Sequence, residues 1–436
     1  MAYIEINQNQ QTRTAVVLPN VSSKPSFSDA ESKMAEALGL AKAINLDVAY
    51  TEIIKLREVK PAAYFSKGFI DRVKPIFESE GINLLVVDAS LTPIQQRNLE
   101  KALKIKVIDR TALILEIFGE RAKTKEGKLQ VELAHLTYQR SRLVRSWTHL
   151  ERQRGGAGFL GGPGETQIEL DRRIIDDKIV RIKKELEKVK KTRELQRSAR
   201  KKIPYPVVAL VGYTNAGKST LFNYLASAGV FAENLLFATL DPTMRRINLP
   251  SGKEIILSDT VGFISDLPHE LIMSFRATLE EVLEADVIVH VRDMSNSDNL
   301  LQKKDVLSVL HNLGLKNIEN DNNYIEVLNK IDLLPEDDKK YLSETTSRSN
   351  NAVAVSSITG EGTPLLLNMI DKKLSANFQD IEVKVNAADG KLLAWLYKNA
   401  DVFSTQTVGE LIILKLKADT ATISRLKNKI QIKTLD

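Results

Sequence analysis

One stretch of the chain combines glycine, lysine and serine at the spacing of a phosphate-binding loop. Residues 212–219 read Gly-Tyr-Thr-Asn-Ala-Gly-Lys-Ser and fit the pattern G-x-x-x-x-G-K-[ST]. An apolar run over residues 207–211 predicts a buried parallel strand before this loop, and residues 220–225 predict a helix after it. The loop amides and the positive end of the helix can bind phosphate oxygens. Lys218 can reach the β- and γ-phosphates, and the Ser219 hydroxyl can ligate magnesium.

A carboxylate and a glycine follow the strand predicted at residues 254–258. Asp259 begins the sequence Asp-Thr-Val-Gly, and its carboxylate can hold the magnesium through a water molecule. The amide of Gly262 can contact the γ-phosphate, so that a moving loop senses whether this phosphate is present. Between the two motifs, Thr239 and Thr243 are alternative candidates to complete the magnesium shell when a nucleoside triphosphate is bound.

The preference for guanine over adenine rests on a third motif, Asn-Lys-Ile-Asp, at residues 329–332. The Asp332 carboxylate can accept hydrogen bonds from N1 and the 2-amino group of guanine, a donor pair that adenine lacks. Lys330 can cover the base, and Asn329 can tie this loop to the phosphate-binding loop. The backbone amides of residues 356–358 can meet the guanine O6. Together these motifs predict a site for GTP.

Four domains are expected to position these motifs. Residues 1–120 predict an α/β domain with a mostly parallel sheet, because β-rich apolar runs alternate with helical patterns. The expected strands are residues 14–18, 46–56, 82–88 and 105–109, and the expected helices include residues 29–43 and 92–103. Thr92 followed by Pro93 is a typical helix start. We find no catalytic cluster here, so a docking or packing domain is expected.

Residues 121–203 predict an antiparallel coiled-coil hairpin of two helices. Apolar residues repeat every seven positions in two series, with others between them. The first series is Leu129, Leu136, Leu143 and Leu150, with Leu133 and Trp147, and the second is Ile168, Ile175, Ile182 and Val189, with Ile179 and Leu186. Arg140, Arg172 and Arg193 interrupt the seam. Each arm of about 24 residues would be about 36 Å long.

A glycine-rich stretch over residues 152–165 joins the two predicted arms, and six of the ten residues from Gly155 to Gly164 are glycine. Glycine disfavours helix but lets backbone amides approach another surface closely. A flexible linker is one interpretation. Because Arg152, Arg154 and Phe159 could bind phosphates and unstacked bases, a probe for structured RNA is the other.

The net charge supports the RNA interpretation through its location. The chain has 436 residues and a net charge of +6. Residues 139–203 hold 19 basic and 9 acidic residues, a net of +10, whereas the other residues hold 43 and 47, a net of −4. A dense charge run can be merely a solvated helix face, but this local excess favours binding to a polyanion.

The remaining chain is predicted to form a GTPase domain with a mostly parallel sheet (residues 204–378) and a small α+β domain (residues 379–436). The latter should have the order strand 381–385, helix 390–399, strand 410–416 and helix 419–429. With no cysteine and no histidines at metal-ligand spacing, disulfides, iron–sulfur clusters and thiolate zinc sites are excluded. We expect a cytoplasmic protein without a signal peptide or membrane span, although peripheral membrane association stays open.

The motifs together resemble a known family. The sequences GYTNAGKST, FATLDPT, DTVGFI and NKID, preceded by GGAGFLGGPGETQIELDRR, are similar to those of the HflX family of ribosome-associated GTPases, within the Obg–HflX-like P-loop GTPases. The similarity covers residues 14–380. It implies binding to the large (50S) ribosomal subunit and its rRNA, with the hairpin loop reaching towards the peptidyl transferase centre. It also implies splitting or rescue of stalled ribosomes, notably under heat stress, and favours Thr239 as the magnesium ligand.

The expected site residues follow from the motifs and the resemblance. Lys218, Thr239 and Gly262 are the expected catalytic residues, Ser219, Thr239 and Asp259 the magnesium ligands, and Arg152, Arg154 and Phe159 the RNA contacts. The residues expected to contact the nucleotide are Gly212, Tyr213, Thr214, Asn215, Ala216, Gly217, Lys218, Ser219, Thr220, Phe237, Ala238, Thr239, Leu240, Asp241, Asp259, Thr260, Val261, Gly262, Asn329, Lys330, Ile331, Asp332, Ser356, Ser357 and Ile358.

The motifs provide no side chain that could orient the attacking water after Gly262. Many GTPases carry a glutamine directly after the Asp-x-x-Gly glycine, but Phe263 and Ile264 occupy this region and cannot orient water. We therefore expect slow Mg²⁺-dependent hydrolysis of GTP to GDP, stimulated by the ribosome. Asn215 resembles the asparagine of potassium-activated GTPases, so K⁺ is a candidate cofactor. His269 is expected to be a surface residue rather than a base.

The leading hypothesis is a monomeric mechanical GTPase that splits 70S ribosomes. A GTP-dependent checkpoint on immature 50S subunits, which binds without splitting, is the second. An RNA-unwinding NTPase or a partner in RNA modification is the third.

Overall fold

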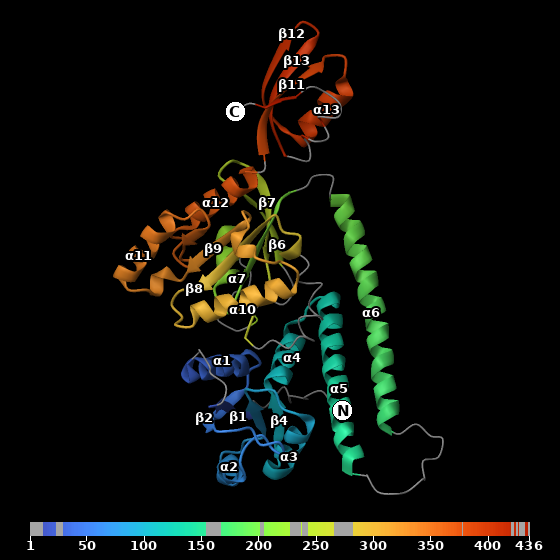
Figure 1. Cartoon of the computed structure of the whole chain (residues 1–436), viewed down its shortest axis with the longest axis vertical. Coiled ribbons are helices and arrows are strands. Elements are labelled where there is room, and N and C mark those ends of the chain that lie inside the picture. Colours follow the sequence, from blue (N-terminus) through green and yellow to red (C-terminus); the bar gives the residue numbers. More distant parts are fainter. Residues whose placement is uncertain are drawn as a thin grey trace.

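The computed structural model describes residues 12–22, 29–153, 167–200, 205–226, 237, 243–265, 282–376, 378–419, 423, 426 and 432–434. The described strands form three sheets, of four, six and four strands. Figure 1 shows the N-terminal unit (blue) and the central unit (yellow to orange) one above the other, and two long helices along one side of them. The C-terminal unit (red) lies at the far end of the central unit. The α/β multidomain architecture predicted from the sequence is confirmed.

The N-terminal sheet is wholly parallel, with the strand order β2-β1-β3-β4. Its strands are β1 (Arg13–Val21), β2 (Asp47–Leu56), β3 (Leu84–Val87) and β4 (Lys106–Asp109), and its helices are α1 (Ala30–Ala43), α2 (Lys67–Ser79), α3 (Pro93–Leu103) and α4 (Arg110–Arg121). Thr92 caps α3 as expected, because its side chain and that of Gln95 exchange hydrogen bonds with each other's backbone.

Helix α2 was missing from the sequence prediction. Pro75 lies inside it, and a proline in a helix interior removes one hydrogen bond and argues against a helix. The apolar residues Phe69, Val73 and Phe77 recur every four positions and are buried against the sheet, which outweighs the cost of the proline.

The predicted hairpin consists of α5 (Lys125–Gln153) and α6 (Gln167–Arg200). With 29 and 34 residues, they are about 43 and 51 Å long, longer than the sequence suggested. The predicted seam is present among the described side chains: Leu129, Leu133 and Leu136 of α5 pack against Ile175, Ile179, Ile182 and Leu186 of α6.

Two of the arginines that interrupt the seam pair with one carboxylate. Arg140 of α5 and Arg172 of α6 both approach Asp176, at 3.1 and 3.9 Å. The seam therefore tolerates both arginines at its rim, where side chains are half exposed. The side chain of Arg193, like those of Trp147, Leu150 and Ile168, lies outside the described residues.

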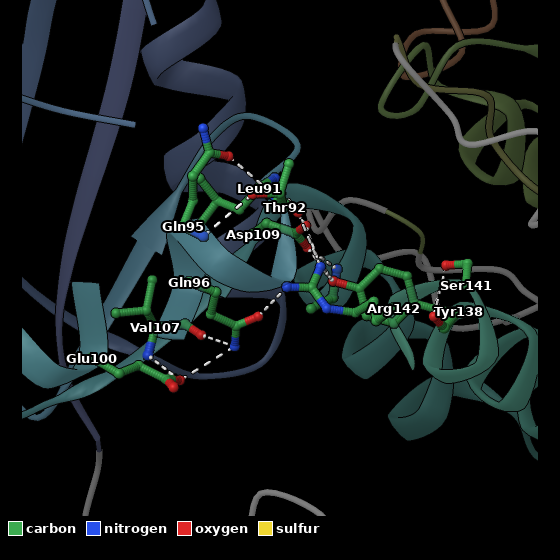
Figure 2. A network of polar contacts seen from close by, with 11 residues as sticks. Leu91, Thr92, Gln95, Gln96, Glu100, Val107, Asp109, Tyr138, Ser141 and Arg142 are labelled. Atoms are coloured by element: carbon green, nitrogen blue, oxygen red, sulfur yellow. Dashed lines mark hydrogen bonds and ion pairs between the residues drawn. The ribbon is translucent and has the colours of Figure 1, made fainter. Parts of the chain in front are cut away.

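The hairpin is anchored to the N-terminal sheet through one carboxylate (Figure 2). Asp109, the last residue of β4, accepts a hydrogen bond from the Tyr138 hydroxyl at 2.8 Å and pairs with Arg142 at 3.3 Å. Arg142 also donates to the carbonyl oxygen of Leu91 at 3.1 Å and to the side chain of Gln96. Because Asp109 is 1% exposed, these bonds form in a low-dielectric setting and fix the position of α5.

The central sheet has the strand order β10-β9-β8-β5-β7-β6 and is parallel except for β6. Its strands are β5 (Val207–Gly212), β6 (Thr243–Asn248), β7 (Glu254–Asp259), β8 (Val287–Asp293), β9 (Tyr324–Asn329) and β10 (Ala352–Ala354). The described helices are α7 (Lys218–Ala226), α10 (Asn299–Asn312), α11 (Glu336–Ser347) and α12 (Thr363–Ala376), with short turns η1 (Ile318–Asn320) and η2 (Ile331–Leu333). The parallel strands β5, β7 and β9 bring their last residues to one edge.

The C-terminal sheet is antiparallel, with the order β12-β13-β11-β14. It comprises β11 (Phe378–Asn386), β12 (Asp401–Val408), β13 (Leu411–Asp419) and β14 (Ile432–Thr434), and α13 (Gly390–Asn399) packs on it. The sequence prediction missed β12, an edge strand rich in Ser, Thr and Gln. The helix expected over residues 419–429 begins too early, because β13 includes Asp419, and only residues 423 and 426 of the rest are described.

None of the described helices has the length and apolar character that are needed to cross a bilayer.

Candidate nucleotide-binding site

The loop between β5 and α7 needs glycine at two positions. A Cβ on Gly217 would lie 2.2 Å from the side-chain nitrogen Nδ2 of Asn329. The φ of Gly217, +91°, also disfavours other residues. A Cβ on Gly212 would lie 2.2 Å from the carbonyl oxygen of Val291. Asn215, with φ of 58°, takes the left-handed conformation that asparagine tolerates. The loop is therefore wrapped closely between β8 and the loop that follows β9.

Lys218 lies buried at the centre of this loop. Its Nζ donates to the carbonyl oxygens of Tyr213 at 2.7 Å and Gly212 at 3.1 Å. Burial lowers the pKa of Lys218 from 10.5 to about 8, although the Asp259 carboxylate acts in the opposite direction. The ammonium group is thus poorly solvated, and Asp259 is the carboxylate that acts on it among the residues that the structure describes, so a phosphate would be a favourable additional partner.

A hydroxyl and a carboxylate meet beside Lys218. The Oγ of Ser219 donates to Oδ2 of Asp259 at 2.7 Å. Both are hard oxygen donors of the kind that Mg²⁺ prefers, and Mg²⁺ sites in nucleotide-binding proteins commonly use one or two such side chains together with phosphate oxygens. The residues present therefore fit a magnesium ion. Thr239, the third expected ligand, lies outside the described residues.

The segment after β7 is hydrogen-bonded directly to the phosphate-binding loop. Thr214 N donates to the carbonyl oxygen of Phe263 at 2.7 Å, and Phe263 N donates to that of Gly212 at 3.1 Å. The Phe263 and Ile264 side chains are buried among apolar residues. Neither of them offers a polar group to a water molecule at the γ-phosphate position.

The loops after β9 and β10 form the expected base-recognition corner. Asn329 Nδ2 donates to the carbonyl oxygen of Ala216 at 2.8 Å, and its Oδ1 accepts from Ser357 N at 3.1 Å and Ser357 Oγ at 2.6 Å. Ser356 Oγ donates to Asp332 Oδ1 at 2.6 Å and so orients that carboxylate. Asn329 therefore links both loops to the phosphate-binding loop, as the sequence suggested.

Lys330 and Ile358 flank this corner. Lys330 has a φ of 65° and pairs with Asp293 at 2.7 Å, which fixes its direction at the end of β8. The Ile358 side chain is 72% exposed. The exposed apolar surface of Ile358 is available for contact with a planar base.

Residues of the N-terminal unit also reach this site, which sequence reasoning missed. The Tyr213 hydroxyl donates to Glu36 of α1 and accepts from Ser265 N at 2.8 Å. Arg110, the first residue of α4, donates to the carbonyl oxygen of Ser265 at 3.2 Å and pairs with Asp88 at 2.7 Å and with Glu36. No local sequence pattern marks these residues, which are brought together only by the packing of two domains.

The Arg110 guanidinium and the carboxylates of Asp88 and Glu36 stabilise each other's charge in this contact. Burial acts against the charge of Arg110, but the carboxylates of Asp88 and Glu36 together hold the pKa of Arg110 above its usual value. Burial and the nearby Glu36 carboxylate raise the pKa of the Tyr213 hydroxyl, which stays protonated and can donate. Phe237 adds an apolar contact, with its ring edge-on to that of Phe118 in α4 at 4.7 Å between centroids.

Several expected site residues cannot be placed. Ala238, Thr239, Leu240 and Asp241 lie outside the described residues, as do Arg154, Phe159 and His269. Arg152 belongs to the last turn of α5 rather than to the connecting loop, and its side chain is not described.

The site as a whole defines the class of protein. A buried lysine and a serine–aspartate pair at the carboxyl edge of a mostly parallel sheet, joined by Asn329 to a guanine-type Asn-Lys-Ile-Asp loop, are the features of a P-loop GTPase.

Four family models match successive parts of the chain. They are described as GTP-binding GTPase N-terminal (residues 31–119), GTP-binding GTPase Middle Region (residues 121–200), 50S ribosome-binding GTPase (residues 207–330) and HflX C-terminal domain (residues 341–421).

Two relatives named GTPase HflX match over most of the chain. The GTPase HflX of Magnetococcus marinus is 45% identical over 426 residues, which cover 98% of this chain and 97% of the relative. The GTPase HflX of Escherichia coli is 44% identical over 78% of each chain. A solved structure, described as SsGBP in complex with GDP, is 26% identical with a TM-score of 0.48, and covers 83% of this chain and 98% of its own. The chain belongs to the HflX family of GTPases and is a GTP-hydrolysing enzyme.

Proposed function

We propose that this GTPase binds the large (50S) ribosomal subunit in its GTP state and splits stalled 70S ribosomes, with a role under stress in the cytoplasm. One observation carries the proposal: two adjacent residues, the last of β4 and the first of α4, contact two different regions. Asp109 holds the middle of α5 through Tyr138 and Arg142, and Arg110 holds Ser265 in the segment after Gly262. A shift of the segment after Gly262 on binding or loss of the γ-phosphate could therefore be transmitted to the hairpin.

At the nucleotide, the proposed roles follow the geometry. Lys218 would bind the β- and γ-phosphates, and Gly262 would sense the γ-phosphate through its amide. Ser219 and Asp259 would hold Mg²⁺, which neutralises charge on the phosphates during transfer, and Thr239 would join them. Asp332, oriented by Ser356, would accept the two donors of guanine.

The hairpin is the proposed RNA-binding element. The net charge of +10 over residues 139–203, most of which belong to the hairpin, favours a polyanion. The GTPase region matches a model described as 50S ribosome-binding GTPase. Arg152, Arg154 and Phe159 are the proposed contacts with ribosomal RNA.

Hydrolysis is proposed to be slow until the ribosome binds, because the segment around Phe263 is apolar. Asn215 is the proposed K⁺ ligand in the phosphate-binding loop. Equal GTP hydrolysis in Na⁺ and K⁺, with and without ribosomes, would show that neither activator operates.

Sucrose-gradient sedimentation of 70S ribosomes with the protein and a non-hydrolysable GTP analogue tests the function. We expect 70S particles to convert to free subunits, with the protein on the 50S fraction, and no conversion with GDP. Intact 70S particles together with protein on free or immature 50S subunits would instead support the assembly checkpoint. Absence from all 50S fractions would exclude both functions.

A further inference from the structure

Thr214 lies where the γ-phosphate end of the site must be. Its Cα and Cγ2 would both be 3.0 Å from a Cβ placed on Gly262, and Lys218 Nζ would be 3.1 Å from the same point. The side chains of Thr214 and Lys218 thus face Gly262 from the same side. Since Gly262 and Lys218 are the two residues proposed to contact the γ-phosphate, Thr214 would stand next to the reacting phosphorus, with its methyl carbon towards Gly262.

The Thr214 hydroxyl is buried and unsatisfied. The residue is 7% exposed, and its Oγ1 has no hydrogen-bond partner among the residues that the structure describes. Its backbone amide, in contrast, is paired with the Phe263 carbonyl at 2.7 Å. Burying a hydroxyl without a partner is unfavourable, and a valine of the same shape would avoid the cost. The hydroxyl is therefore poised for a partner that arrives with the nucleotide.

The side chains of Phe263, Ile264 and Lys218 offer no acceptor for a hydrogen bond from a water molecule at the γ-phosphate. The two residues after Gly262 are Phe263 and Ile264, both apolar and buried. Lys218 carries only donors, so it can bind phosphate oxygens but cannot accept a hydrogen bond from water. A hydroxyl can do both, because it has one donor and two acceptor positions.

We propose that the Thr214 hydroxyl orients the attacking water in GTP hydrolysis. The hydroxyl accepts a hydrogen bond from the water and donates a hydrogen bond to a γ-phosphate oxygen. The water oxygen then bonds to the γ-phosphorus while the bond from that phosphorus to the β–γ bridging oxygen breaks, and the bond's electron pair stays with GDP. Both hydrogens of the water end on inorganic phosphate, so Thr214 neither gains nor loses a proton overall.

Single-turnover hydrolysis by the full-length protein, without ribosomes, tests this role. Thr214→Val removes the hydroxyl and keeps the shape, and should slow hydrolysis about ten- to a hundredfold. Thr214→Ser retains the hydroxyl, and its hydrolysis rate should stay within about threefold of the wild-type rate. The Kd for GDP should be unchanged in both variants, because GDP lacks the γ-phosphate. Since the assay contains no ribosomes, its result is independent of the proposed ribosomal function.

A matched control is Thr346→Val in α11. Thr346 is also a buried threonine of the central unit, but its hydroxyl donates to the carbonyl oxygens of Leu342 at 2.9 Å and Ser343 at 3.2 Å. This variant should lower thermal stability and leave the hydrolysis rate unchanged. Wild-type hydrolysis by Thr214→Val would overturn the proposal. So would a loss of GDP affinity equal to the loss of rate, because the hydroxyl would then only maintain the shape of the loop.

Discussion

The N-terminal and central sheets both place carboxylates where parallel strands end, but they use them differently. In the central sheet, Asp259 and Asp332 each have a hydroxyl partner, from Ser219 and Ser356, and lie beside the phosphate-binding loop or the base-recognition corner. In the N-terminal sheet, Asp109 accepts four bonds within the protein, from Leu91 N, Ala112 N, Tyr138 and Arg142.

The difference shows that position in a parallel sheet does not by itself make a ligand site. Strand ends of a parallel sheet are favourable places for polar groups, and ligands often bind there. Whether they bind depends on the partners that the rest of the chain supplies. Beyond the end of β3, Asp88 pairs with Arg110 of α4, and at the end of β4, Asp109 pairs with Arg142 of α5. These arginines occupy the carboxylates, so this edge of the sheet serves as a joint between parts of the protein.

Removal of the carboxylate at this joint should have the largest effect. Asp109→Ala leaves the partly buried Arg142 guanidinium without its carboxylate, and we expect a loss of about 3–5 kcal/mol in the free energy of unfolding. Urea unfolding followed by circular dichroism would measure it. The exposed Asp47, which pairs with Arg13 at 3.7 Å, provides a control, and Asp47→Ala should change stability by about 0.5 kcal/mol or less. Similar losses for both variants would mean that the joint does not stabilise the fold.

The nucleotide edge should show a pH dependence of stability through Lys218. The folded-state pKa of Lys218 is about 8, below its ordinary value of 10.5, so the unfolded chain binds a proton more readily than the folded one between these values. Without nucleotide, stability relative to Lys218→Met should therefore rise by about 3 kcal/mol from pH 8 to pH 10.5. Denaturant unfolding at several pH values would measure the rise. A flat difference would mean that burial does not lower the pKa of Lys218 in the folded protein.

Two arginines of α5 allow a finer comparison. Arg142 is 17% exposed and bonded to the N-terminal unit, whereas Arg140 is 42% exposed and paired with Asp176 across the hairpin. Arg142→Leu should lower the free energy of unfolding by about 2 kcal/mol. Arg140→Leu should lower it by less than about 1 kcal/mol, because exposed ion pairs contribute little. The reverse order would place the main anchor of α5 in the coiled-coil seam.

The sequence predicted the nucleotide edge far better than the joint. Residues 212–219, 259–262 and 329–332 are local motifs, in which chemistry dictates both residue type and spacing. The contacts of Arg110 with Glu36 and Ser265 span 74 and 155 residues, and each residue alone is an ordinary surface type. Only the packing of α1 and α4 against the central unit creates the contact, so no pattern in one segment could predict it.

Secondary structure followed the same rule. Strands with strong apolar runs and helices with clear caps, such as α3, were predicted correctly. Helix α2 was missed because of its internal proline, and β12 because an edge strand needs few apolar residues. The domain boundaries proposed at residues 120, 203 and 378 stay a prediction.

The central claim is that the nucleotide state reaches the hairpin through Arg110 and Asp109. The most direct test is the ratio of 50S affinities with a non-hydrolysable GTP analogue and with GDP, measured for the wild type and Arg110→Lys. Lysine keeps the charge but cannot bond Asp88, Glu36 and Ser265 at once. We predict a ratio well above one for the wild type and near one for Arg110→Lys, with unchanged affinity for the nucleotides themselves. An unaltered ratio in the variant would contradict the claim.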